Sequence, residues 1–341
     1  TDSILIQADS NGSAPTTGTL NDAKWNTGIG ASVFKHLTDG NRNTGIGYHS
    51  LEELTGGARN TAVGFESLGA ITTSNYNVAI GFQAGAGAWS GADSNIAIGY
   101  QALNGSLTAD KIIAIGRQAG QAHTSGTDSI YMGTFCALNV TTGSRNLVIG
   151  YEAYDGATTE SDNIAIGHSA LGGSVNGAEK TIAIGNYTLD ALTSGDNNVA
   201  IGYSAGSALT TQASNTMVGF EAGTSSTSVE STYVGYYAGR NNLSNYNTAI
   251  GAEAMITYGD KTAERNTAIG NAALKVIQTG DRNTAVGAYN GLAVTTGSDN
   301  IFLGYSSGDN ITTGDNNVVI GAADVTATGD DQLSISSGDG G

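Results

Sequence analysis

The five residues Asn77-Val78-Ala79-Ile80-Gly81 contain the pattern that decides the fold of this chain. Aligning the glycine of every similar triplet gives eighteen copies, from Gly30 to Gly321, and twelve of the seventeen spacings between them are 17 residues. Self-similarity at a fixed period is the signature of repeat architectures, in which each unit stacks on its neighbours. So regular a period leaves no room for a separate globular domain within it.

The columns around this glycine, which we number as position 0, predict a short strand. Position −1 is always apolar, and position −3 is Thr, Val or Ile in every copy except Leu147. Because these positions are two residues apart, they share one face of an extended chain, whereas helical spacing would separate them. Position −2 is mostly Ala. We interpret the branched −3 and −1 positions as the buried face and position −2 as the outer face.

Asparagine and glycine mark the corners of each copy. Position −4 is Asn in fourteen of the eighteen copies. Stacked asparagines can pass side-chain amide hydrogen bonds from coil to coil, and glycine lets the chain turn sharply after the strand. The predicted structural corner residues include Asn77, Gly81, Asn163, Gly167, Asn198, Gly202, Asn266 and Gly270.

The repeat predicts an all-β fold, a parallel β-solenoid of about 18 coils with a period of about 17 residues. One coil cannot bury its apolar face alone, but stacked coils form a continuous core. We assign residues 23–325 to the solenoid and residues 1–22 to an N-terminal cap or junction. Residues 326–341 predict a degenerate last coil, with a strand at 332–336, and a flexible exit at 338–341.

Composition and charge exclude several function classes. The chain has 30 acidic and 13 basic residues and a net charge of −17, which disfavours nucleic-acid binding and association with an anionic membrane surface. No apolar run of about 18 residues is present that could insert into a membrane. Cys136 is the only cysteine, so no intrachain disulfide can form. The first residue is Thr1 rather than Met, which favours a processed product or one segment of a longer protein.

The repeated core resembles the head repeat of the YadA-like trimeric autotransporter adhesins, over about residues 26 to 321. Intact copies of the motif are Asn77-Val-Ala-Ile-Gly81, Asn163-Ile-Ala-Ile-Gly167, Asn198-Val-Ala-Ile-Gly202 and Asn266-Thr-Ala-Ile-Gly270. In that family the repeat builds a left-handed parallel β-roll, and three chains associate side by side into a surface fibre. Similar repeats resemble those of phage tail fibres. The period here is longer than the family's usual coil, and neither an anchoring barrel nor a coiled-coil stalk is evident, which favours a phage-type fibre.

The resemblance implies a homotrimer and suggests a role for position −2. A stripe of small side chains would let neighbouring chains approach closely, with the bulky exceptions acting as anchors. We therefore predict an interchain stripe that includes Ala62, Ala79, Ala97, Ala165, Ala200, Ala268, Tyr131, Tyr233 and Phe302.

Residues that could carry catalysis are few. The most regular acidic column, at position +2, consists of Glu66, Glu152, Glu221 and Glu253. A glycan-cleaving pair needs two carboxylates about 5–9.5 Å apart, whereas glutamates two coils apart would lie about 10 Å from each other. The histidines are His36, His49, His123 and His168. They stand on separate coils without the spacing of metal ligands. We predict no catalytic, cofactor-binding or metal-binding residues, and no enzyme activity.

Three alternatives for binding stay open. Asp and Asn recur in the closing turns, as at Asp196, Asp281 and Asp315, where turn formation explains them without calcium. Tyrosines such as Tyr48 and Tyr100 could form a carbohydrate or protein contact surface, or could stack as ladders along the coil edges. Ranks of Thr can order water on an ice-binding solenoid, but a Thr column that alternates with Val and Ile fits a buried position better.

These observations together predict a structural and adhesive protein. The first hypothesis is a shaft or head segment of an extracellular attachment fibre of the phage tail-fibre type, located on a virion or a cell surface. Its expected partners are two further copies of the chain, a host-surface glycan or protein receptor, and other fibre components at its ends. The second hypothesis is a bacterial trimeric surface adhesin, and the third is a glycan depolymerase.

Overall fold

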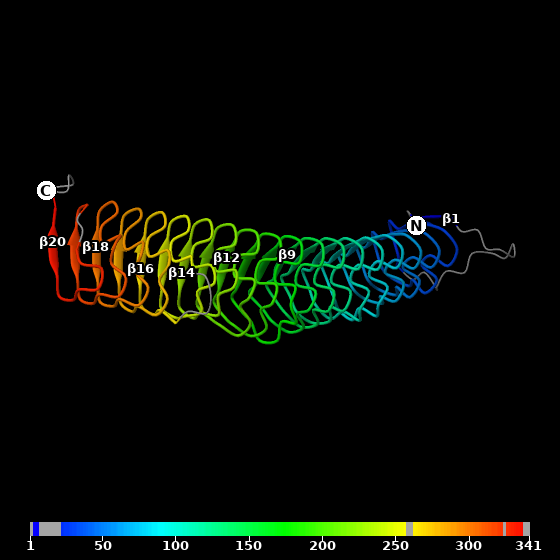
Figure 1. The fold of residues 1–341 in the computed structure, drawn as a ribbon. Coiled ribbons are helices and arrows are strands. Elements are labelled where there is room, and N and C mark those ends of the chain that lie inside the picture. The colour runs from blue at the N-terminus through cyan, green and yellow to red at the C-terminus, as the bar shows by residue number, and fades with distance from the viewer. Residues whose placement is uncertain (1–2, 7–21, 257–261, 323–324, 337–341) are drawn as a thin grey trace. The chain divides into compact units, whose positions relative to one another are not determined.

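The computed structural model describes residues 3–6, 22–256, 262–322 and 325–336. In these residues the chain is an all-β parallel solenoid of about 18 coils with a period of about 17 residues, as the repeat predicts. The described residues contain no helix, and so no helix long and apolar enough to cross a membrane. The chain divides into two compact units, Thr1–Asn176 and Gly177–Gly341, which are described separately. Figure 1 shows the strands of each unit side by side, one in each coil.

Every strand has three residues and, in the repeats, occupies positions −3 to −1. Unit 1 contains β1 (Ile4–Ile6), β2 (Thr27–Ile29), β3 (Thr44–Ile46), β4 (Thr61–Val63), β5 (Val78–Ile80), β6 (Ile96–Ile98), β7 (Ile113–Ile115), β8 (Ile130–Met132), β9 (Leu147–Ile149) and β10 (Ile164–Ile166). Unit 2 contains β11 (Ile182–Ile184), β12 (Val199–Ile201), β13 (Thr216–Val218), β14 (Thr232–Val234), β15 (Thr248–Ile250), β16 (Thr267–Ile269), β17 (Thr284–Val286), β18 (Ile301–Leu303), β19 (Val318–Ile320) and β20 (Leu333–Ile335).

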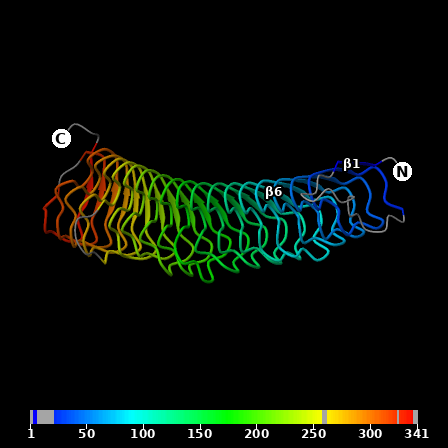
Figure 2. The same cartoon turned by 90° about the vertical axis from the view of Figure 1, so that its right-hand side faces the viewer.

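Neighbouring strands within each unit pair in parallel and in register, so that equivalent repeat positions lie beside each other. Figure 2 shows the successive coils of each unit stacked one behind the next. At the N-terminal end β1 pairs with β2, and at the C-terminal end β20 pairs with β19. The predicted last strand at 332–336 therefore corresponds to β20. Most of the predicted cap at 1–22 and the predicted exit at 338–341 lie outside the described residues.

The faces of the strands are the reverse of those predicted. The side chains at position −2 point into the coil and are fully buried within a single chain, as at Ala79 and Ala97, whereas the branched side chains at positions −3 and −1 point outward. The predicted interchain stripe is therefore wrong. Its members Ala62, Ala79, Ala97, Ala165, Ala200, Ala268, Tyr131, Tyr233 and Phe302 all belong to the core of one chain.

The narrow interior of the coil explains this reversal. The opposite wall supplies large side chains from positions +4 and +7, such as Leu68, Ile71 and Leu103, and these leave little space behind the strand. Small residues at position −2 fit that space. An interior at normal packing density could not also accommodate a branched side chain from every strand.

The aromatic exceptions at position −2 support the packing constraint, because Tyr131, Tyr233 and Phe302 each face a glycine at position +4 of the same or the preceding coil. A methyl group added to Gly120 would lie 2.7 Å from Cδ2 of Tyr131, and one added to Gly291 would lie 2.9 Å from Cδ2 of Phe302. The reverse arrangement occurs at Gly28, where the glycine is at position −2 and the bulky residue, Phe34, is at position +4. A methyl group added to Gly28 would lie 3.0 Å from Cδ2 of Phe34. Residue volume is thus compensated across the interior.

The asparagines at position −4 form a buried ladder along the corner of each unit. Asn60 shows the pattern: its Oδ1 accepts hydrogen bonds from the backbone N–H and the side-chain Nδ2 of Asn77, at 3.0 and 3.2 Å. Its own Nδ2 donates to the carbonyl of Ser74 at 2.8 Å. The turn after the strand needs glycine, since Gly81 has a φ of +135° and an added methyl group would lie 2.6 Å from the carbonyl oxygen of Gly99.

A second ladder at position −6 runs in the opposite sense. Here a side-chain oxygen accepts a hydrogen bond from the backbone N–H of the preceding coil, as Asn75 Oδ1 does from Ala58 at 2.9 Å and Asp315 Oδ1 from Ser298 at 2.7 Å. The two ladders satisfy backbone groups at a corner where the strand pairing has ended.

Replacing Asn60 with Ala should destabilise the solenoid by about 2–4 kcal/mol, because it leaves the buried backbone N–H of Asn77 and the carbonyl of Ser74 without this partner. Replacing the exposed Asn139 with Ala should cost less than about 1 kcal/mol. Chemical denaturation of both variants at equal protein concentration measures the difference. Equal losses of unfolding free energy in the two variants would show that the buried asparagine ladder contributes no more than the exposed Asn139.

Candidate functional site

Each unit presents a regular face formed by positions −3 and −1, which we call the outer face. It comprises these positions of β2–β10 in unit 1 and of β11–β19 in unit 2. Its apolar side chains are half-exposed, with Ile80 at 40% and Ile269 at 37%. None of the 30 acidic and 13 basic residues of the chain stands at either position. An apolar, uncharged strip of this extent on so acidic a chain is typical of an interaction surface.

Aromatic side chains at position +1 stack along the coils as ladders. In unit 1 the rings of Phe65 and Phe82 have centroids 5.0 Å apart and planes 6° apart, and Tyr48 and Tyr100 continue the stack on either side at 5.4 Å. Unit 2 repeats the arrangement with Tyr203, Phe220 and Tyr236. Along each stack the ring faces contact one another, so that the ring edges are left to contact a ligand. A sugar that stacks on a ring face therefore finds few faces available, which favours the ladder interpretation.

Charged side chains at position −5 pair along the corner that precedes each strand. Arg145 binds both carboxylate oxygens of Asp162 at 2.6 and 2.8 Å, and Arg282 binds Asp299 in the same way. Hydrogen bonding from Arg282 lowers the pKa of the Asp299 carboxyl below its ordinary value. These pairs are exposed and contribute little stability, but they keep charge at the side of the strand and off the outer face.

The Thr side chains at position −3 are half-exposed and not buried as predicted, so the argument from burial against ice binding does not hold. Threonines nevertheless occupy this position in only eight of the eighteen copies. From Val78 to Val199 the rank is wholly Val, Ile or Leu and carries no hydroxyl groups. The outer face therefore suits an apolar partner better than an ordered water lattice.

Polar groups of functional interest in the interior are buried and inert. His123 occupies the apolar +7 column: its Nε2 donates to the Gly126 carbonyl at 2.7 Å, and Tyr131 Oη lies 3.4 Å from its Nδ1. The carbonyl can only accept, so Nε2 carries the proton of the neutral ring. Burial lowers the pKa of His123 below its ordinary value. Burial also raises the pKa of the Cys136 thiol to about 12, which leaves it without thiolate at neutral pH.

The predicted acidic column is largely occupied by ion pairs and hydrogen bonds. Glu221 lies 3.2 Å from Arg240, and Glu253 lies 2.6 Å from Lys275. Glu66 accepts a hydrogen bond from Gln83 at 2.7 Å. Each of these carboxylates thus has a hydrogen-bond or ion-pair partner of its own.

The described residues contain no group of three or more potential ligands that could hold a metal ion. The Asp residues of the closing turns that suggested calcium instead accept backbone hydrogen bonds between coils, as Asp196 does from Glu179 at 2.8 Å and Asp281 from Glu264 at 2.7 Å. Their recurrence is therefore explained by the ladder at position −6.

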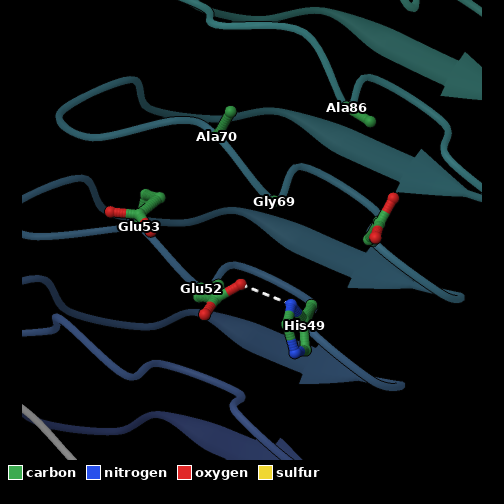
Figure 3. A pocket seen from close by; sticks show the side chains of 7 residues that line it. His49, Glu52, Glu53, Gly69, Ala70 and Ala86 are labelled. Carbon is green, nitrogen blue, oxygen red and sulfur yellow. Dashed lines mark ion pairs between the residues drawn. The ribbon is translucent and has the colours of Figure 1, made fainter.

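A pocket of about 240 Å³ lies in unit 1 among three successive coils, after β3, β4 and β5 (Figure 3). It is lined by His49, Glu52, Glu53, Glu66, Gly69, Ala70 and Ala86. His49 Nδ1 contacts Glu52 Oε2 at 2.6 Å, and Lys35 Nζ contacts the other oxygen of Glu52 at 2.9 Å. Sequence reasoning missed this pocket, because it depends on small residues at +5 and +6 in only some of the coils.

Comparisons with known proteins give no relative: no family model, no curated protein and no solved structure matches this chain.

Lowering the pH from 7 to 5 should destabilise the wild type more than a His123→Leu variant. The unfolded chain takes up a proton near pH 6.5, whereas the buried ring resists it, so stability is lost as pH falls, by at most about 2 kcal/mol at pH 5. Unfolding at both pH values measures this difference. The control Ile71→Leu, at a buried +7 position without a titratable group, should keep the wild-type dependence, and an equal effect of both substitutions would contradict the assignment.

Proposed function

We propose that this chain is a shaft or head segment of an extracellular attachment fibre of the phage tail-fibre type, in which three copies pack side by side through the outer face. The observation that carries the proposal is the uncharged and largely apolar outer face, which recurs from coil to coil within each unit. Covering half-exposed Ile and Val side chains stabilises an assembly by about 25 cal/mol for each Å² of apolar area removed from water.

The arrangement of charge supports association through this face alone. With a net charge of −17, copies of the chain repel one another over most of their surface. The outer face is the surface on which neighbouring copies can approach without burying a charge, and obligate interfaces are typically apolar at their centre. The left-handed β-roll type of coil and the trimeric state follow from the resemblance to the YadA-like head repeat.

A structural role also agrees with the chemistry of the described residues. A solenoid whose corners are hydrogen-bonded from coil to coil is suited to extension and rigidity. Its regularly repeated surface, rather than a single cleft, would contact a glycan or protein receptor on a host cell, while its ends would join other fibre components. The acidic column offers ion-paired carboxylates in place of the paired acid and base that a glycan depolymerase requires.

Charges placed on the outer face should separate the copies without unfolding the chain. In Ile80→Lys/Ile98→Glu the two new charges are neighbours across one ladder and can pair within the chain, but their burial would penalise an interface. Sedimentation equilibrium should give three times the 34.3 kDa chain mass for the wild type and the single-chain mass for this variant at micromolar concentration.

The matched control is Ser106→Lys/Ser125→Glu, which adds the same charges at exposed positions away from the strands and should remain trimeric. Circular dichroism checks that all three proteins keep their β-structure. A wild-type chain that sediments as a stable monomer at micromolar concentration would rule out the proposed assembly.

Receptor binding should occur without turnover. We expect a glycan array or a panel of host-surface proteins to reveal specific binding by the trimer, and a reducing-sugar assay on the same glycans to detect no release. Release of reducing ends by the purified protein would instead identify a depolymerase.

A further inference from the structure

The pocket beside Glu66 lies where two other coils of the same chain seat a basic side chain. In unit 2 the glutamate at position +2 pairs with the residue at position +5 of the following coil: Glu221 with Arg240, and Glu253 with Lys275. For Glu66, the residue at this +5 position is Ala86, which cannot form an ion pair and lines the pocket together with Gly69. The repeat therefore shows, twice in the same chain, that this position relative to a +2 glutamate accommodates an ammonium or a guanidinium group.

The pocket has the charge and the space for such a group. The carboxylates of Glu52, Glu53 and Glu66 line it, and its volume of about 240 Å³ exceeds the space that an ammonium group needs. Lys35 and His49 pair with Glu52, and His36 Nε2 lies 3.7 Å from Glu53 Oε1, so the cations described around the pocket serve Glu52 and Glu53. Among the described residues, the side-chain carboxylate of Glu66 has a single hydrogen-bond partner, the neutral amide of Gln83. Its negative charge therefore remains without a cation, unlike those of Glu221 and Glu253.

We propose that this pocket binds an organic cation, an alkylammonium or guanidinium group that completes the missing ion pair with Glu66. An organic cation is favoured over a metal ion because no group of three potential metal ligands occurs among the described residues, whereas both in-chain counterparts are nitrogen cations. The group could belong to a lysine or arginine side chain of a partner protein or to a free amine, which share the same chemistry. No lining residue stands at position −3 or −1, so this site is separate from the outer face and independent of the association of copies.

Ligand-observed saturation-transfer NMR on the full chain tests the proposal with three probes: N-acetyl-lysine methylamide, 1,4-diaminobutane, and the uncharged N-acetyl-norleucine methylamide. We expect saturable binding of the lysine probe, with a dissociation constant of about 1 mM, and none of the norleucine probe. Equal binding of the diamine would show that a free amine suffices, whereas binding of the lysine probe alone would indicate a protein side chain.

Two variants test the location of the site. Glu66→Gln should weaken binding at least tenfold, and Ala86→Lys should abolish it, because the new lysine occupies the place of the ligand. The matched control is Asn104→Lys, at position +5 of the next coil, where the preceding +2 residue is Gln83; it should bind like the wild type. Conversely, Lys275→Ala should add a second site beside Glu253.

The proposal is overturned if neither cationic probe binds, or if binding persists unchanged in both Glu66→Gln and Ala86→Lys. It is also overturned if CaCl2 displaces the lysine probe far more strongly than NaCl at the same ionic strength, because the site would then be selective for a metal ion. Circular dichroism of each variant excludes loss of the fold as the cause of lost binding.

Discussion

The in-register stacking of one coil on the next is the constraint on which the rest of this structure depends. A strand of three residues has too few hydrogen bonds to hold its position, so the corners must fix the register. They do this with two ladders of opposite sense, one through the buried asparagines at position −4 and one through side-chain oxygens at position −6. Because a slip of one residue would break both ladders and exchange the two faces of the strand, every coil presents the same face to solvent.

The narrow interior and the outer face are two consequences of the same geometry. Small residues at position −2 let the opposite wall fill the core with leucine and isoleucine. Since side chains alternate along a strand, the branched residues at −3 and −1 must then point outward. Repetition turns two half-exposed side chains in each coil into a continuous apolar strip. Charge is excluded from this strip and collects at the neighbouring −5 corner, where Arg145 pairs with Asp162.

The period, the parallel coils and the position of the strands could be predicted from the sequence, because the spacing of Gly and the Asn column reflect local geometry. Which face of the strand points into the coil could not be predicted from alternation alone, because both faces of the strand are apolar. A signal was nevertheless present: Tyr131, Tyr233 and Phe302 each occur with a glycine at position +4 of the same or the preceding coil, which indicates that positions −2 and +4 share one interior. The pocket beside Glu66 is harder to predict, because it depends on how three coils leave a space between them.

The central claim is that a single solenoid has an apolar face that other copies of the chain cover. Electron microscopy of the purified protein, with class averages viewed along the fibre axis, tests this claim most directly. We expect three solenoids related by threefold symmetry, with their outer faces turned toward the common axis. Averages that contain one isolated solenoid, or copies joined through another surface, would contradict it.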